Sequence, residues 1–438
     1  MRNEKMVLSA FLLAGGYDDY AWRLPGSRAE ELGGLDLAVW IARRYEDAKL
    51  DSVFSADAIS TEWQLSQRMK GANPYEPMTV LTAVAARTSR IGVIGTFSTA
   101  FYHPYVLARQ LAALDRLSEG RAGWNIVTTG AGRNDYGLAS PPIAERYQHA
   151  AEFVEVTGKL WSSWSDDAVV VDRTAGIWHD TDKIAVVDHH GTYFDVTGVL
   201  NIPRSAQGRP LLVQAGQSSA GMDFGASTAD AIYTAQADKA QARQHYAALK
   251  ERAAAFGRDP DHLKVLPGLL PYLGKTDAEA LDFFHSTGRF IDFDASRVEF
   301  RRMYRVDLTD LDLGERVPME RFDAVDLTGM DSRYHFFRHM AEDGRTLRDV
   351  LLNFETAGGH KICIGSPATV ADTMIDWFES RACDGFSLNA PAVPASVDQI
   401  CDLLIPELQE RGYARTEYGQ TTLRGHLGLP VPSPRDRG

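Results

Sequence analysis

Two adjacent serines stand where a short apolar run gives way to a predicted helix, in the segment 214–221 (QAGQSSAG). The unpaired backbone N–H groups and the dipole at a helix start can bind a phosphate, and the hydroxyls of Ser218 and Ser219 would add donors. The same serines would also serve as ordinary N-caps with no ligand present. The spacing therefore leaves two interpretations open, a phosphate site and a plain helix cap.

Metal and covalent chemistry find less support in the sequence. His335 and His339 stand four residues apart, but two imidazoles alone leave a zinc ligand set incomplete. No G-x-S-x-G nucleophile motif occurs, and Cys363 in KICIG is interpreted as a small buried apolar residue. The segment 130–135 (GAGRND) lacks the third glycine of a dinucleotide loop and is interpreted as a turn that could carry a flavin or substrate contact. We predict no metal site.

The elements that must position these residues are short apolar runs alternating with helical patterns, of which eight read as strands. They cover 5–13, 51–57, 91–99, 121–129, 210–216, 230–235, 263–273 and 384–390. Strands separated by helices pair in parallel through right-handed crossovers, and eight such units close most naturally into a barrel. The predicted fold is an α/β protein, a (β/α)₈ TIM barrel, with a doubly wound open sheet as the alternative.

The domain organisation follows from the places where the alternation of strands and helices is interrupted. We expect one domain over 1–438, with insertions at about 162–209, after the fourth strand, and at about 289–348, after the seventh. The second insertion is either a lid over the barrel or a set of surface helices. An extension at about 411–438, rich in Gly, Pro and Arg, is expected to be mobile or to wrap around another subunit.

Composition narrows the class of protein. The 438 residues carry a formal net charge of -13, which disfavours binding to nucleic acid or to anionic membranes. Three cysteines without C-x-x-C spacing suggest neither a disulfide framework nor a thiolate zinc site, and fit a reducing cytoplasm. The apolar start is interpreted as a buried first strand rather than a secretory signal. No apolar run reaches the ~20 residues of a membrane-spanning helix.

In a TIM barrel the carboxyl ends of the strands carry the chemistry, so the residues at those ends are the candidates. They include Asp57, Thr96, the run 125–129 and the run 216–219. Together they predict a mouth rich in hydroxyl and amide groups.

The same segments carry a family resemblance. EPMTVLTAVAARTSRIGVIGTFST, HPYVLARQLAALDRLSEGRAGWNIVTT, ERYQHAAEFVEV, LLVQAGQSSAG and DGFSLNAP resemble the nitrilotriacetate monooxygenase component A and dibenzothiophene-sulfone monooxygenase branch of the luciferase-like flavin monooxygenases. The likeness covers about residues 5–406, and the blocks WNIVTT and QAGQSSAG are fairly specific to this branch.

The resemblance implies a cofactor, a partner and a set of site residues. The family uses FMN as FMNH₂, delivered by a separate NAD(P)H:flavin reductase, with O₂ as co-substrate. Asp57 and Thr96 match family positions at the flavin ring or ribityl chain, and Tyr147, Ser218 and Ser219 match positions near the phosphate. The family often has a histidine where this chain has Ile143, so one cofactor contact is lost or replaced.

The implied activity is a two-component monooxygenase that transfers one oxygen atom, through a flavin hydroperoxide, to a small organosulfur, amine or chelator, or natural-product substrate. Family members are homo-oligomers, so we expect a homodimer or homotetramer. His103, Tyr136 and His360 are candidates for proton handling, and none is singled out by the sequence. A deazaflavin-dependent oxidoreductase and a non-catalytic flavin-binding protein are the alternatives, and a metal-dependent barrel hydrolase is a third.

Overall fold

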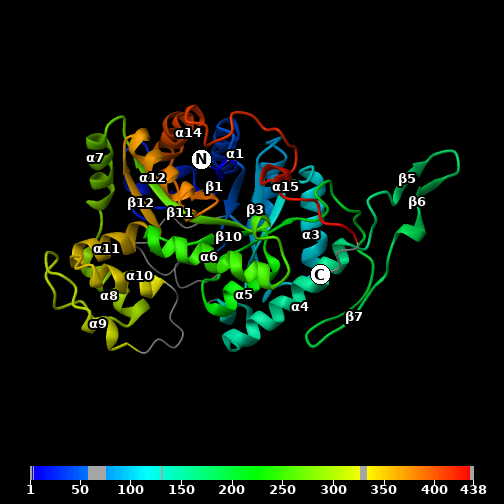
Figure 1. Ribbon diagram of the computed structural model, residues 1–438, viewed down its shortest axis with the longest axis horizontal. Helices are drawn as coiled ribbons and strands as arrows, with labels where there is room; N and C mark the ends of the chain where they lie inside the picture. The colour runs from blue at the N-terminus through cyan, green and yellow to red at the C-terminus, as the bar shows by residue number, and fades with distance from the viewer. Residues whose placement is uncertain (1, 3, 58–74, 130–131, 326–332, 435–438) are drawn as a thin grey trace.

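A closed barrel of parallel strands forms the centre of the computed structural model, which describes residues 2, 4–57, 75–129, 132–325 and 333–434 (Figure 1). Each barrel strand pairs in parallel with the next, and the last pairs with the first, as predicted. In order around the ring the strands are β1 (Val7–Phe11), β2 (Ser52–Ser55), β3 (Gly92–Ser98), β4 (Ala122–Val127), β9 (Leu211–Gln214), β10 (Ala231–Thr234), β11 (Lys264–Leu273) and β13 (Gly385–Leu388).

One strand of this sheet was missed by the sequence analysis. The KICIG segment forms β12 (Lys361–Gly365), which pairs in parallel with residues Leu269–Leu273 of β11. β11 is ten residues long, and its first half already pairs with β10. The second half therefore extends beyond the ring and leaves hydrogen-bonding groups that β12 satisfies.

Helices surround the barrel, and several begin at caps that are readable in the sequence. Glu76 accepts hydrogen bonds from the backbone N–H groups of Met78 and Thr79, and Ser366 precedes Pro367 at the start of another helix. The helices next to the barrel strands are α1 (Leu35–Asp47), α2 (Pro77–Ala85), α3 (Pro104–Leu117), α4 (Ile143–Trp161), α5 (Ser219–Thr228), α6 (Lys239–Ala255), α7 (Asp277–Gly288), α12 (Pro367–Glu379), α13 (Ala395–Gln399) and α14 (Ile405–Glu410). None of the described helices is both long and apolar enough to cross a membrane.

The inside of the barrel is apolar toward the amino ends of the strands and polar toward their carboxyl ends. Ile94 and Val213 belong to one apolar cluster inside the barrel. Thr96, Asn125 and Val213 are in register on adjacent strands, so Thr96 and Asn125 share the inward face of Val213. The mouth of the barrel is therefore lined by polar side chains, as predicted.

The C-terminal extension closes the other end of the barrel. α15 (Leu423–His426) and the turn after it contribute Leu423, Leu427 and Leu429 to the apolar cluster inside the barrel. The expectation of a mobile extension is wrong for residues 411–434, which pack on their own barrel, while contact with another subunit stays a prediction. Sequence composition suggested mobility, whereas three spaced leucines supply enough apolar surface to anchor the segment.

The two interruptions of the barrel have different structures (Figure 1). Residues 162–209 form two antiparallel hairpins, β5 (Val169–Asp172) with β6 (Ile177–His179) and β7 (Val187–His190) with β8 (Asp195–Gly198). The second interruption forms α8 (Phe293–Tyr304), α9 (Glu320–Asp323), α10 (Arg333–Glu342) and α11 (Leu347–Thr356). These helices enclose an apolar core of their own, built around Phe300, Phe322 and Phe337.

Candidate active site

Tyr147 on α4 meets the turn that leads from β9 into α5. A β-carbon placed on Gly216 or on Gly221 would lie 2.7 Å from the Tyr147 hydroxyl oxygen. The Tyr147 ring also packs against Phe224 of α5, with ring centroids 5.7 Å apart. A side chain at either position would therefore displace the tyrosine hydroxyl, which lies at the start of α5.

The two serines of this turn differ in role. Ser218 is the N-cap of α5, and its hydroxyl oxygen accepts a hydrogen bond of 3.1 Å from the backbone N–H of Gly221. Ser219 is the first residue of the helix, and its side chain is exposed. Ser218 thus caps α5. The cap does not exclude a ligand, because the helix start still presents other backbone donors, so the choice between the two interpretations stays a prediction.

Arg146 and Arg133 bring positive charge together at the loop after β4 and the start of α4; sequence reasoning missed Arg146 and considered Arg133 only as part of the GAGRND turn. Arg146 donates to the carbonyl oxygen of Thr128 at 3.3 Å, while its Nε is buried without a hydrogen-bond partner. Burial lowers the pKa of the Arg133 guanidinium, and the charge of Arg146 lowers it further. The available signal was the position of Arg146 directly before Tyr147. Ile143, the departure from the family pattern, is the first residue of α4 and is exposed.

Thr96 and Asn125 form a buried polar pair inside the barrel. The Asn125 side-chain amide donates a hydrogen bond of 3.0 Å to the Thr96 hydroxyl oxygen. Asn125 Oδ1 is buried and lacks a protein partner. Leaving a buried carbonyl unsatisfied costs about 1–3 kcal/mol, so this oxygen is suited to receive a donor from a bound molecule.

Asp57 follows β2 at the same end of the barrel and is exposed. Its charge acts on Tyr102: burial raises the pKa of the Tyr102 hydroxyl to about 12, with Glu76 and Asp57 contributing. Tyr136 stacks on Phe101, with centroids 4.2 Å apart. The loops after β2, β3 and β4 therefore place an acid and several aromatic rings around the mouth. Residues 130 and 131 of the GAGRND turn lie outside the described residues.

His360 lies over the barrel at β11. A β-carbon on Gly268 would come within 2.2 Å of His360 Nδ1, so the imidazole occupies space that only glycine leaves open. His360 Nδ1 is buried without a partner, and the ring meets Tyr17 edge-on, with centroids 5.5 Å apart. Burial lowers the pKa of His360 to about 4, and the charge of Arg333 on α10 lowers it further. His360 is thus a neutral imidazole at pH 7.

Asn389, directly after β13, is another buried polar side chain with an unpaired atom. Sequence reasoning did not single it out. Its Nδ2 is buried and unpaired, and its Oδ1 accepts from Ser387 at 3.4 Å. The available signal was its place at the carboxyl end of a predicted barrel strand.

The three candidates for proton handling, His103, Tyr136 and His360, differ in burial and in hydrogen bonding. His103 caps α3, where its Nδ1 accepts from the backbone N–H of Tyr105 at 3.2 Å. Tyr136 is exposed. His360 alone of the three offers a buried, unpartnered nitrogen at the barrel mouth.

Cys363 is buried, and burial raises the pKa of its thiol to about 11, as expected for a packing residue. Among the described residues no group of three or more His, Cys, Asp or Glu side chains could hold a metal ion.

Comparison with known proteins gives this geometry a context. The sequence profile of the luciferase-like monooxygenases matches residues 21–384. The chain is 36% identical to N-acetyl-S-(2-succino)cysteine monooxygenase of Bacillus subtilis and 34% identical to nitrilotriacetate monooxygenase component A of Aminobacter aminovorans. Each comparison covers 98% of both chains.

A solved structure is also similar over almost the full length. A riboflavin lyase, crystallised with a modified FMN and riboflavin, superposes with a TM-score of 0.84 at 29% identity, over 98% of this chain and 97% of that one. The predicted barrel and the predicted family resemblance are both confirmed. The chain belongs to the luciferase-like monooxygenase family, and it is a flavin-dependent monooxygenase.

Proposed function

We propose that the protein binds reduced FMN at the barrel mouth, with the phosphate at the start of α5 and the ring system toward Thr96, Asn125 and His360. The observation that carries this proposal is the Tyr147 hydroxyl held against Gly216 and Gly221. A phosphate there would receive the hydroxyl hydrogen bond and the free backbone donors of α5, and Arg146 would supply charge.

The residues at the mouth fit a flavin in a second respect. Asn125 Oδ1, Asn389 Nδ2 and His360 Nδ1 are buried polar atoms with no protein partner. A flavin ring carries both N–H donors and carbonyl acceptors along its polar edge, so it can satisfy groups of both kinds. The deazaflavin alternative gains no support from the relatives, which are both named as monooxygenases.

The bound flavin supplies the oxygen chemistry, and the protein supplies binding, orientation and exclusion of water. Thr96 fixes the Asn125 amide through the 3.0 Å hydrogen bond, which leaves Oδ1 to accept a hydrogen bond from the flavin. His360, neutral at pH 7, can accept or donate a hydrogen bond at Nδ1, depending on its tautomer. The helices α8–α11 stand beside this end of the barrel, where they would limit access of water.

The substrate class is proposed from charge. Arg333, the first residue of α10, lies against Gly359 and acts electrostatically on both His360 and Tyr17. A guanidinium at the mouth suits a carboxylate. The substrates named for the two relatives, N-acetyl-S-(2-succino)cysteine and nitrilotriacetate, both carry several carboxylates. We therefore propose a small, carboxylate-bearing organosulfur compound or amine as substrate.

The partner implied by this chemistry is a separate NAD(P)H:flavin reductase. The test is calorimetric titration of the purified protein with FMN, with FMNH₂ under argon and with riboflavin, followed by O₂ consumption with a reductase. Binding that requires the phosphate and is tighter for FMNH₂ supports the proposal. Equal affinity for riboflavin and FMN would contradict the phosphate site, and binding without reductase-coupled oxygenation would favour the non-catalytic alternative.

A further inference from the structure

The imidazole of His360 is held by packing at its Nδ1 side, not by a hydrogen bond there. Among the described residues Nδ1 has no partner, and the ring meets that of Tyr17 edge-on, with centroids 5.5 Å apart, and fills the space over Gly268. Tyr17, in the loop after β1, and Arg333, on α10, are the titratable and charged groups that face it. The orientation of the imidazole therefore depends on what fixes Tyr17 and the turn that carries His360.

The loop after β1 is fixed by a buried carboxyl group, that of Asp18, which is 1% exposed. Its Oδ1 accepts a hydrogen bond of 3.0 Å from the backbone N–H of Tyr20, and its Oδ2 accepts one of 2.9 Å from the Tyr272 hydroxyl on β11. The neighbouring Tyr17 backbone N–H donates to the carbonyl oxygen of Ala390 at 2.8 Å. Asp18 thus ties the loop that carries Tyr17 to a strand of the barrel.

The turn that carries His360 is tied to the same loop by a second buried acid, Glu355, which is 5% exposed. Glu355 lies in the last turn of α11, and its Oε2 accepts a hydrogen bond of 3.1 Å from the Tyr20 hydroxyl. Two glycines with left-handed backbone, Gly358 at φ +54° and Gly359 at φ +90°, then lead the chain into His360. Because only this short turn separates them, a displacement of Glu355 would displace His360.

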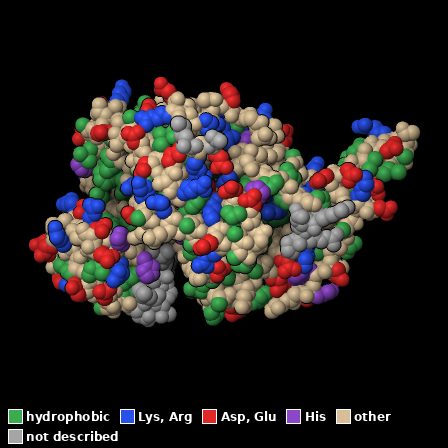
Figure 2. Space-filling model, in the orientation of Figure 1, with side chains coloured by type: hydrophobic (Ala, Val, Ile, Leu, Met, Phe, Trp, Pro, Cys, Tyr) green, Lys and Arg blue, Asp and Glu red, His purple; other side chains and the backbone are tan. Residues whose placement is uncertain are grey.

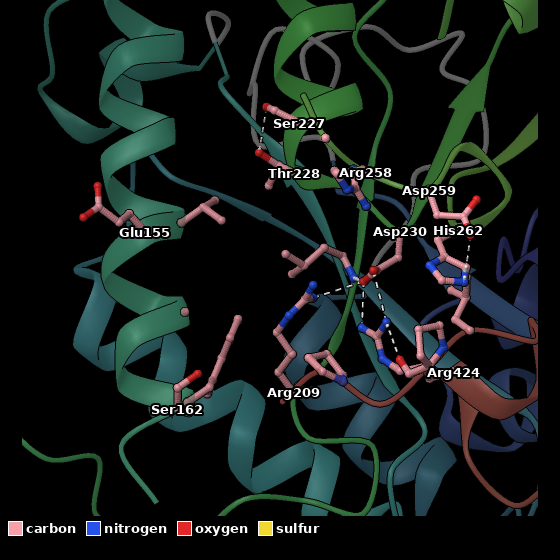
Figure 3. Close-up of a pocket in the computed structure, with 18 of the residues that line it drawn as sticks. Glu155, Ser162, Arg209, Ser227, Thr228, Asp230, Arg258, Asp259, His262 and Arg424 are labelled. Atoms are coloured by element: carbon pink, nitrogen blue, oxygen red, sulfur yellow. Dashed lines mark hydrogen bonds and ion pairs between the residues drawn. The ribbon is translucent and has the colours of Figure 1, made fainter. Parts of the chain in front are cut away.

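Two other buried carboxyl groups of the chain have cationic partners. Asp230 accepts from Arg209 and Arg424 at the amino end of the barrel (Figure 3), and Asp384 lies 3.0 Å from the Lys250 ammonium. On the surface, acidic and basic side chains lie interleaved (Figure 2). An acid that is buried without a basic partner therefore stands out in this chain.

Asp18 and Glu355 are such acids. Within the described part of the chain they accept from hydroxyl and backbone N–H groups and form no ion pair. Burial raises the pKa of the Asp18 carboxyl, and the charge of Glu355 raises it further. Burying an acid without a cation costs stability, so two of them around one loop are typical of a functional site rather than of a stabilising contact.

We propose that Asp18 and Glu355 are positioning residues, which hold the His360 imidazole in its orientation at the barrel mouth through the Tyr17 ring and the two-glycine turn. Their importance for the reaction rests on the proposed function, in which His360 faces the flavin ring. The positioning itself does not depend on the cofactor, so it can be measured in the flavin-free protein.

The titration of His360 in the full-length protein measures this positioning. In protein labelled with carbon-13 at histidine, the NMR signal that is lost in His360→Gln identifies the residue. The wild-type imidazole, with a pKa of about 4, should stay neutral down to pH ~5. Tyr20→Phe removes the hydrogen bond to Glu355, and Tyr272→Phe removes the one to Asp18. Each should let water reach the imidazole and raise its pKa by about one unit or more, toward ~6.5.

Two matched variants separate positioning from a general loosening of the fold. Glu355→Gln removes a charge but keeps an oxygen that accepts from the Tyr20 hydroxyl, so the pKa of His360 should not rise. Tyr413→Phe removes a similar hydrogen bond, 2.9 Å long, to Glu379 near the amino end of β1, and should also leave this pKa unchanged. An unchanged pKa in both Tyr20→Phe and Tyr272→Phe, or an equal rise in either matched variant, would overturn the proposal.

Adding FMN to the labelled protein tests the link to the cofactor. The His360 signal should move in the wild type, because the proposed function places the flavin ring beside it, and it should move less in Tyr20→Phe. A signal that does not move in the wild type would contradict that placement of the flavin, whereas the comparison of pKa values would still decide the positioning. An equal movement in wild type and Tyr20→Phe would overturn the role of the two acids at the flavin site.

Discussion

The Tyr147 hydroxyl oxygen lies 2.7 Å from the point where a β-carbon on Gly216 would stand, so a side chain at position 216 would displace a tyrosine of α4. The contact joins two segments about seventy residues apart in sequence at the proposed phosphate site. Five predictions follow from it and from other contacts of the molecule.

Gly216→Ala should displace the Tyr147 hydroxyl and weaken FMN binding. A hydrogen bond to a charged group contributes about 1.5–3 kcal/mol, so the dissociation constant should rise roughly tenfold to a hundredfold. Titration calorimetry with FMN and riboflavin measures this, and the affinity for riboflavin should change little because it has no phosphate. Gly314→Ala is the control, since a β-carbon there meets nothing within 4 Å. Equal losses for FMN and riboflavin would show a general distortion instead.

Thr96→Val should destabilise the protein even without flavin. The substitution keeps the shape but removes the acceptor of the Asn125 amide, leaving a buried donor unpaired at a cost of about 1–3 kcal/mol. Urea unfolding provides the measurement. In Thr82→Val the lost hydroxyl bonds only to the carbonyl oxygen of Met78 in its own exposed helix, so the loss should be smaller. A stability equal to wild type would mean that Asn125 finds another acceptor.

Arg424→Gln should weaken the attachment of the C-terminal extension. Arg424 donates to both carboxylate oxygens of Asp230, at 3.1 and 2.8 Å, in a buried pair. Burial alone raises the pKa of Asp230, but Arg209 and Arg424 hold it well below its usual range. Breaking such a pair costs about 3–5 kcal/mol. Thermal unfolding measures the loss, and Arg302→Gln, which breaks the exposed pair with Glu299, should have a much smaller effect.

His426 should make the protein less stable in acid. Its Nε2 lies 2.8 Å from the carbonyl oxygen of Arg90, and burial lowers its pKa to about 4. Because the unfolded imidazole has a pKa near ~6.5, the unfolded state binds more protons between these values. The contribution of neutral His426 is therefore present above pH ~6.5 and is lost toward pH 4, by up to about 3 kcal/mol.

The check for His426 compares wild type and His426→Gln by urea unfolding at several pH values. The advantage of wild type should shrink as the pH falls through this window. The exposed His190 should behave in the opposite way, because hydrogen bonding to Asp195 raises its pKa and its contribution is lost as the pH rises. A pH-independent difference between wild type and His426→Gln would contradict the assignment.

Arg333→Gln should raise the KM for carboxylate-bearing substrates by about tenfold with little change in kcat, since the guanidinium would bind the substrate in both ground and transition states. Steady-state kinetics with a flavin reductase and either N-acetyl-S-(2-succino)cysteine or nitrilotriacetate would show whether KM rises while kcat stays unchanged. Arg338→Gln, which removes a second guanidinium from the same helix, one bonded to Asp323 at 2.9 Å, is the matched control. If both variants raise KM equally, the effect comes from α10 as a whole.

Much of the architecture could be predicted from local patterns. Apolar runs alternating with segments of helical periodicity predicted parallel strands joined by helices, and hence the barrel. The sequence analysis did not predict β12, because an isolated five-residue apolar run has no periodicity. Its pairing partner exists only because β11 is longer than the other barrel strands. The packing of the C-terminal extension was not predicted, because the expectation rested on its overall composition. Three leucines at suitable positions anchor the extension to the barrel.

The sequence by itself determined which residues stand at the carboxyl ends of the strands, because strand order and residue type are local properties. Family resemblance and strand-end position predicted cofactor contacts at Asp57, Thr96, Tyr147, Ser218 and Ser219. Only the tertiary structure decided which of these meet. Tyr147 contacts the α5 turn because α4 crosses it, and His360 stands over Gly268 because β11 lacks a side chain there. Such contacts depend on the packing of segments far apart in the chain, which no local pattern encodes.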